Sequence, residues 1–348
     1  MLLKNRRSGQ TIEISFYTDQ QAVDIAVSCL ISAYGEENNY VKPEMFDKNY
    51  LLDGIKRDKM RVFAAVAADG TPAVAVTLFR QPYFENAWEM GAAAVSNSYK
   101  GFHLASAIVR HILNKFENAS QPLFYAHATL FYTRAGMALE DNGFVPTGFL
   151  YAVCDAGKHM SQLNFTSLKH TLALYIRNNG TTDVGKLYVP EHLAEFIMEL
   201  YGALGISPVL VRSGSSRDAS GPDATKRDIS IPGNPSQLSY EQDEYHLTLY
   251  IYIMTCGVDL KSRLKAIECQ YTQKLQSMVL HLNINDPGAV YGYEMLKDSG
   301  YKFSGIKPLC GDHEYLLMSK FGSSLISTAE LQMTDLDRRV YERVDRIE

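Results

Sequence analysis

Apolar and polar residues along the first 150 positions follow a pattern that predicts strands and helices in mixed order. Apolar runs predict strands, whereas apolar positions spaced by three and four predict amphipathic helices. The dipeptide Asp69-Gly70 separates two apolar runs and is typical of a tight β-hairpin. The expected elements are strands at 13–17, 61–68 and 73–79, a strand ending at 95, a strand at 123–128, and helices at 22–34 and from 104.

The second half of the chain repeats this order with low sequence fidelity. Its expected elements are a strand and a helix within 187–205, a strand within 245–256, a helix at 260–273, a strand at 278–284, a helix from 286 to 298 and a strand at 314–321. The turn Gly300–Gly305 resembles an earlier turn at Gly143–Gly148. The second half is therefore predicted to be a degenerate copy of the first, with an unrelated α/β domain as the alternative.

Chain length and local composition suggest where the domains, a loop and a C-terminal tail begin and end. A chain of 348 residues is long enough for two domains. The segment 212–237 is rich in Ser, Gly, Pro, Asp and Arg, and is predicted to be a flexible loop, with a lid over a pocket as the alternative. Alternating charges at helical spacing predict a helical tail. The expected domains are 1–165 and 166–330, followed by the tail at 331–348.

The segment between the strand that ends at Val95 and the helix that begins near Leu104 carries the strongest functional signal. A helix start exposes backbone N–H groups and the positive end of the helix dipole, which together favour a phosphate. Lys100 adds a full charge, and Gly101 lets the backbone approach a ligand closely. Small residues at 91–94 leave room for a slender group along the strand. These features predict a site for a phosphate-bearing cofactor with a long arm.

This segment resembles motif A of the GNAT superfamily, the acetyl-CoA-dependent N-acetyltransferases. In that family a strand ending in Val is followed five residues later by the pattern [Q/R]-x-x-G-x-[G/A]. Lys100 stands at the Arg/Gln position, His103 replaces the first Gly, and Ala105 fits the Gly/Ala position. The order and spacing of the surrounding elements also agree, and Asn142–Gly148 resembles the GF…G turn of the family.

The resemblance implies an α/β fold of the α+β type, with a mixed central sheet flanked by helices, here in two tandem copies. It also implies acetyl-CoA, or another acyl-CoA, as co-substrate and no metal. The cofactor would contact the backbone of Val95 and the turn made by Lys100, Gly101, Phe102, His103, Leu104 and Ala105. In the second half, no glycine stands at the corresponding turn after Cys256.

Acetyl transfer to an amine requires that the amine lose a proton and that the thioester carbonyl be polarised. Glu89 lies at the offset from the motif where some GNAT members carry a general-base glutamate, although an ion-paired or exposed carboxylate is the alternative. His127 ends a strand whose family counterpart diverges from the motif strand, so it is a second candidate, with a satisfied histidine as the alternative. His103 could bind a phosphate or ribose, or could simply replace glycine.

The general-acid tyrosine of many family members is missing, because Leu139 stands at that position and Leu296 at its counterpart. Tyr132 is the best substitute, and a merely packed tyrosine is the alternative. No cysteine is placed to form an acyl-enzyme, so direct attack by the amine is expected. Between Tyr34 and Leu52, the aromatic residues Tyr40, Phe46 and Tyr50 could line a substrate cleft or simply pack.

Charge and cysteine usage narrow the class of protein. The net charge of −5, without a basic stripe, gives no reason to expect a nucleic-acid partner. No apolar run reaches the length of about 20 residues needed to span a membrane. The five scattered cysteines form no CxxC pair and are expected to be buried free thiols, and the N-terminus lacks an apolar signal segment. A cytoplasmic protein is therefore expected.

The sequence thus predicts an N-acyltransferase that acts on a small-molecule or peptide amine, which would enter beside Glu89 and His127 between the two halves. Neither the acceptor nor the oligomeric state is indicated. One alternative is a GNAT-derived CoA-binding, ligand-binding or regulatory module that has lost catalysis. Another is an aminoacyl-tRNA-dependent ligase, which the acidic balance disfavours.

Overall fold

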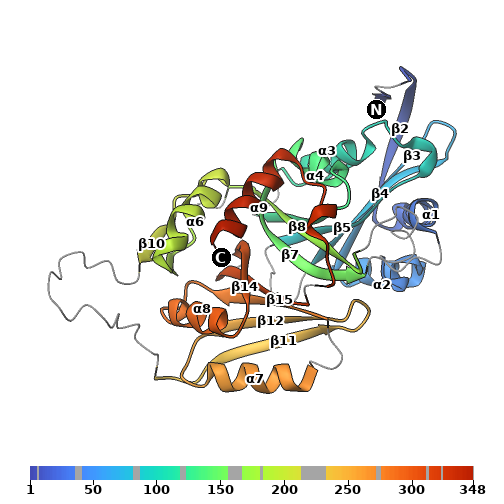
Figure 1. Ribbon diagram of the computed structural model, residues 1–348. Helices are drawn as coiled ribbons and strands as arrows, with labels where there is room; N and C mark the ends of the chain where they lie inside the picture. The colour runs from blue at the N-terminus through green and yellow to red at the C-terminus, as the bar shows by residue number, and fades with distance from the viewer. Residues whose placement is uncertain are drawn as a thin grey trace.

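The computed structural model describes residues 1–5, 8–35, 41–80, 87–117, 123–155, 167–180, 183–212, 233–271, 276–310, 313–322 and 324–347. Within these residues, thirteen strands form one continuous mixed sheet (Figure 1). Helices cover the sheet on both faces, so the prediction of an α/β fold with a mixed central sheet flanked by helices is confirmed.

The helices and strands follow one another in two series. The first series contains β1 (Leu2–Lys4), β2 (Thr11–Thr18), α1 (Val23–Tyr34), α2 (Lys48–Lys56), β3 (Met60–Ala67), β4 (Pro72–Arg80), β5 (Ala87–Val95), α3 (Leu104–Lys115), β6 (Leu123–Thr129), α4 (Arg134–Glu140), β7 (Val145–Asp155) and β8 (Lys169–Asn178). The second contains β9 (Lys186–Val189), α6 (Glu191–Ala203), β10 (Val209–Arg212), β11 (Gln237–Asp243), β12 (Thr248–Thr255), α7 (Leu260–Tyr271), β13 (Ser277–Asn283), α8 (Ala289–Asp298), β14 (Lys302–Cys310) and β15 (His313–Phe321), with α9 (Asp335–Ile347) at the C-terminal end.

The strand order repeats on the two sides of a junction between β7 and β14. Counted outward from this junction, the order is β7-β8-β6-β5-β4 on one side and β14-β15-β13-β12-β11 on the other. Within the thirteen-stranded sheet each series contains one parallel pair, β5 with β6 and β12 with β13, whereas β9 and β10 form a separate parallel two-stranded sheet. Because β8 lies between β6 and β7, the first series extends to Asn178, past the expected boundary at residue 165.

Two glycines allow β7 and β14 to meet. Gly148 pairs with Gly305, and these are the last residues of the two similar turns in the sequence. A Cβ on Gly305 would lie 2.2 Å from the Gly148 Cα, and a Cβ on Gly148 would lie 2.8 Å from the Ser304 carbonyl oxygen. Gly305 also has a φ of +127°, which side-chain-bearing residues rarely adopt. The junction therefore requires glycine in both strands.

The sheet of the first series is buried on both faces, which explains its continuous apolar runs. Alternate residues of a strand face opposite sides. In β3, Val62 and Ala64 share a core with α1, whereas Phe63 belongs to the larger core with α3. The apolar pattern does not predict α2, whose N-terminus is capped by a hydrogen bond from the Asn49 amide to the Asp47 carboxylate.

The C-terminal helix α9 packs against β7, β14 and α6, on the junction between the two series (Figure 1). Its buried Asp337 accepts a hydrogen bond from the Tyr175 hydroxyl of β8 at 2.6 Å. The loop expected at 212–237 lies almost entirely outside the described residues, and β11 begins at Gln237. None of the helices in the described ranges is long and apolar enough to cross a membrane.

Four cysteines have described side chains, and all four are free thiols. Cys29 and Cys256 are buried, and Cys154 is partly buried. Cys269 is exposed on α7, so the expectation that the thiols are buried is wrong for this residue. It lies on α7 outside the buried positions Leu260, Leu264 and Ile267, and the residue type alone does not predict this exposure.

Candidate functional site

The sheet opens where β5 and β6 separate. In the described strands the ladder between them covers only Ala87–Met90 and Leu123–Ala126, although both strands continue beyond it. On its other edge β5 bulges against β4 around Ala92, which has a φ of +45°. A bulge bends the strand and removes backbone groups from the ladder. The result is the divergence that the family resemblance implies.

A cavity of about 1550 Å³ occupies this opening. One wall comes from β5, β6 and the turn before α3, and another comes from β11, β12, β13 and β14 of the second series. Tyr34 at the end of α1 also lines the cavity, and so does the segment after α1, through Val41, Lys42, Glu44, Met45 and Tyr50. Phe46 instead packs against the core beneath α1, and Tyr40 lies outside the described residues.

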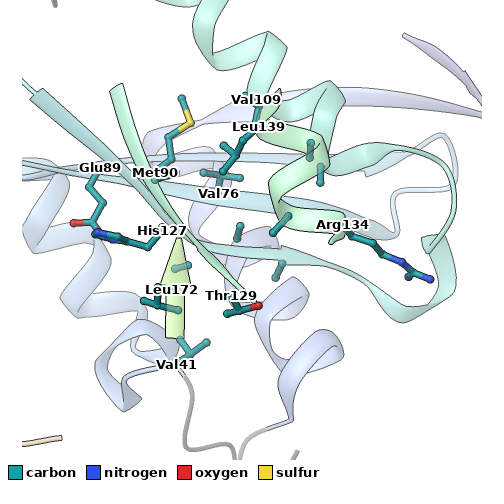
Figure 2. Close-up of a pocket in the computed structure, with 18 of the residues that line it drawn as sticks. Val41, Val76, Glu89, Met90, Val109, His127, Thr129, Arg134, Leu139 and Leu172 are labelled. Carbon is teal, nitrogen blue, oxygen red and sulfur yellow. The ribbon is translucent and has the colours of Figure 1, made fainter. Parts of the chain in front are cut away.

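Glu89 and His127 are in direct contact on the cavity wall. Glu89 Oε1 lies 3.0 Å from His127 Nδ1, and the two side chains point toward one another (Figure 2). The Tyr125 hydroxyl donates a second hydrogen bond to Glu89 Oε2 at 3.3 Å. The side chains of Glu89 and His127 are 19% and 18% exposed, so the pair is largely desolvated and still reachable from the cavity. This arrangement can orient a carboxylate for proton transfer.

The turn before α3 and the first turn of this helix line the same cavity. His103 caps the helix with a φ of +57°, and its side chain makes no capping hydrogen bond within the described residues. The first-turn residues Leu104, Ala105 and Ser106 line the cavity. Because N–H groups of the first turn have no intrahelical partner, this end of α3 is suited to an anion.

Side chains of the turn differ in what they can offer a ligand. Lys100 and His103 are exposed and line the cavity, and so does Gly101, with a φ of +95°. Phe102 is buried in the core and can contribute its backbone only. Val95 lines the cavity at the end of β5, where its backbone has left the ladder with β6.

Tyr34 stabilises the bulge of β5. Its hydroxyl donates to the Ala93 carbonyl at 2.8 Å. Burial raises the pKa of Tyr34, and the nearby Tyr132 raises it further. Tyr132 lines the cavity just before α4, and Leu139 of α4 lines it too, so the position of the missing tyrosine offers no hydroxyl. Tyr132 is therefore placed in the cavity, beside the bulge and not in the Glu89–His127 contact.

The second series contributes Tyr252, His281 and Lys307 to the opposite wall. The rings of Tyr252 and His281 are stacked, with centroids 4.6 Å apart. The Lys307 ammonium lies 4.4 Å from the centroid of the Tyr125 ring. Burial lowers the pKa of His281 well below its ordinary value, and the charges of Lys307 and His127 lower it further. His281 is therefore neutral at physiological pH.

An ion pair joins the two series at one side of the cavity. Lys42 Nζ lies 3.0 Å from Oδ2 of Asp243, the last residue of β11. Burial opposes the charge on Asp243, but the hydrogen bond and charge of Lys42 outweigh it and lower the pKa of this carboxyl. The Tyr245 hydroxyl also donates to the Val41 carbonyl at 3.5 Å. Residues after α1 are thus attached to the second series.

Sequence reasoning missed three residues of this site, namely Tyr125, Tyr34 and Lys307. Tyr125 could have been found, because it lies two residues before His127 and shares its face of the strand. Lys307 lies on β14, for which the sequence pattern predicted only the turn that ends at Gly305 and no strand beyond it. Across the described residues, no group of three or more His, Cys, Asp or Glu side chains is arranged to hold a metal ion.

No family model matches the sequence, and no curated protein matches it either. Solved structures similar in fold include an N-acetyltransferase from Staphylococcus aureus, at 14% identity and a TM-score of 0.39, covering 48% of this chain and 99% of that one. Another is spermidine N-acetyltransferase from Vibrio cholerae, solved with CoA and spermine, at 15% identity and a TM-score of 0.36, covering 48% of this chain and 95% of that one.

A third is a protein from Desulfovibrio desulfuricans assigned as a GNAT-family acetyltransferase, at 15% identity and a TM-score of 0.37. It covers 48% of this chain and 100% of that one. At these identities the likeness is one of fold alone, and it extends over about half of the chain.

Proposed function

We propose that this protein is an N-acyltransferase that transfers an acetyl or other acyl group from acyl-CoA to an amine. The observation that carries the proposal is the position of the Glu89–His127 pair. It lies on the wall of the cavity that opens where β5 and β6 separate, and the N-terminal turn of α3 lines the same cavity. A proton acceptor and an anion site are thus combined in one cavity, as transfer from acyl-CoA requires.

The residues of this cavity fit acyl-CoA. The backbone of Lys100 to Ala105 and the Lys100 ammonium would bind the pyrophosphate, because a helix start and a cation both favour anions. The backbone of Val95 would hydrogen-bond the pantetheine arm, since this part of β5 has left its ladder with β6. Bound acyl-CoA supplies the activated acyl group and a thiol leaving group.

Glu89 accepts the proton that the amine loses, directly or through one water molecule. The hydrogen bond from Tyr125 and the contact with His127 keep the carboxylate oriented. His127 can pass the proton on, because its Nδ1 contacts Glu89 and its imidazole carries a second ring nitrogen. Tyr132 is proposed as a polar group beside the leaving thiol, although a thiolate can leave without a dedicated acid.

We further propose that the second series is a tandem copy that does not bind acyl-CoA. Its strands β12 and β13 stay paired through Ile253 and Leu282, so no opening forms between them. Segment 234–236 packs on the turn before α7: a Cβ on Gly257 would lie 2.0 Å from the Asn234 carbonyl oxygen. This copy instead supplies the acceptor wall of the first cavity.

Acetyl-CoA binding, measured by isothermal titration calorimetry, tests the cofactor site. Wild type should bind with micromolar affinity, and the double variant Lys100→Glu, Ala105→Glu should abolish binding, because it places two negative charges at the anion site. Lys115→Glu is the matched control, since Lys115 is exposed at the opposite end of α3. Its affinity should equal that of wild type. Absence of binding in wild type would refute the proposal.

Turnover of the Glu89→Gln variant tests the base. This change should lower kcat by about 10²- to 10⁴-fold, the usual range for a general base, and leave the acetyl-CoA Kd unchanged. Glu44→Gln, another carboxylate on the cavity wall, is the control. A regulatory module that has lost catalysis is the second candidate, favoured by the absence of a hydroxyl at Leu139. Tight CoA binding without turnover of any amine would support it.

A further inference from the structure

Lys307 is a buried cation that the proposed proton transfer does not use. The residue is only 6% exposed and lines the cavity. Its ammonium lies over the Tyr125 ring, and the Tyr125 hydroxyl donates to Glu89. Lysine is rarely buried to this extent, because removing its charge from water is costly. Its ammonium is linked to Glu89 through Tyr125, and this position on the cavity wall points to a function.

The repeated strand order shows that packing does not require a lysine here. Gly305 pairs with Leu317 as Gly148 pairs with Leu174, so Lys307, two residues further on, stands where the first series has Leu150. Leu150 is a buried apolar residue that also lines the cavity, so an apolar side chain suffices at this position in the first series. The same comparison equates His281 with His127, because these histidines pair with Leu317 and Leu174 respectively.

The groups around Lys307 define what it could bind. Glu89 and His127 lie on the facing wall, and the neutral His281 and the ring of Tyr252 lie on its own side. An amine seated at Glu89 would therefore bring its remaining atoms toward a fixed positive charge. An anionic substituent would be attracted to that charge, and a second cationic one would be repelled.

We propose that Lys307 binds the carboxylate of the acceptor, so that the acceptor is an amino acid or a similar amine with a carboxylate close to its nitrogen. This inference rests on the proposed acyl transfer and adds its substrate class. Glu89 takes the amine and Lys307 the carboxylate, one from each series. Lys307 is thus a specificity-determining residue, supplied by the half of the chain that does not bind acyl-CoA.

The test compares amino acids with their decarboxylated amines: L-tyrosine with tyramine, L-tryptophan with tryptamine, and L-lysine with cadaverine. Acetyl-CoA consumption is measured by thiol release. In at least one pair, the amino acid should have a KM at least about tenfold lower than its amine. Lys307→Met should raise that KM by about 10- to 100-fold, the loss expected for a charged hydrogen bond, and leave the KM of the amine nearly unchanged. Lys307→Arg should retain the preference.

Lys320→Met is the matched control. Lys320 lies on the neighbouring strand β15, and its ammonium also lies over a tyrosine ring, at 5.1 Å from the centroid of Tyr301, but it is not part of the cavity lining. Its kinetics should match those of wild type. Equal losses for both members of a pair in Lys307→Met would overturn the inference, and so would turnover of the decarboxylated amines alone. Failure of wild type to bind acetyl-CoA is read separately by calorimetry, and would overturn the proposed function and this inference with it.

Discussion

Replacing Gly305 by alanine should weaken the junction between the two series of strands. The added Cβ would lie 2.2 Å from the Gly148 Cα and 2.5 Å from the Thr147 carbonyl oxygen, both backbone atoms that cannot rotate away. Ordinary contact begins at 3.4 Å, so β7 and β14 would have to separate by about 1.2 Å. Overpacking of this kind costs about 1–3 kcal/mol.

The backbone conformation adds to this cost. Gly305 has a φ of +127°, and holding a side-chain-bearing residue there costs about 1–3 kcal/mol more. The total is roughly 2–6 kcal/mol. For cooperative unfolding of a chain of this length, at about 2.1 cal/mol/K per residue, the loss lowers Tm by about 3–8 °C. Lys307 lies two residues along β14, so acceptor binding should weaken more than acetyl-CoA binding.

Differential scanning calorimetry of Gly305→Ala beside Gly300→Ala separates the two costs. Gly300 also has a positive φ, +83°, but a Cβ there would meet no atom within 4 Å. Gly300→Ala should therefore show the conformational cost alone, about 1–2 kcal/mol, and a correspondingly small fall in Tm. If the two variants melt at the same temperature, the close approach of β7 and β14 does not exist in solution and the reasoning fails.

Three further predictions concern titration, reactivity and the cavity wall. Burial raises the pKa of Glu314 to about 7, so the stability that this carboxyl contributes is full below pH 4.5 and is lost as pH rises through 7. Glu314→Gln should therefore raise the free energy of unfolding at pH 8 by up to roughly 3 kcal/mol, and raise Tm with it, but have little effect at pH 5. Thermal melts at the two pH values measure this difference. Maleimide labelling followed by mass spectrometry should modify exposed Cys269 well before Cys154, whose pKa burial raises to about 12; faster labelling of Cys154 would contradict the structure. Tyr34→Phe removes the hydrogen bond to the Ala93 carbonyl at the bulge, and should raise the acetyl-CoA Kd by about 2- to 12-fold in calorimetry, whereas an unchanged Kd would show that the bulge needs no such support.

The sequence by itself determined the order of the elements, the hairpin at Asp69-Gly70 and the turn before α3. These features are local: the period of apolar residues selects helix or strand, and a glycine or an aspartate selects a turn within a few residues. Local pattern also placed Glu89 and His127 on strands, although β6 continues past His127 to Thr129. It missed α2 and β11, because short polar-rich elements have no clear apolar period, and it also missed the buried strand β8 beyond the expected boundary at 165.

Only the tertiary structure decided which of these residues meet. Glu89 contacts His127 because β5 and β6 are parallel neighbours, and their pairing ends at Met90. The bulge that bends β5 near this point lies in its pairing with β4, so neither β5 nor β6 alone predicts the separation. Lys307 reaches the same cavity because two glycines, far apart in the chain, let β14 pair with β7. Long-range pairing depends on the fit of whole surfaces, so no local pattern could have placed that lysine opposite the candidate base.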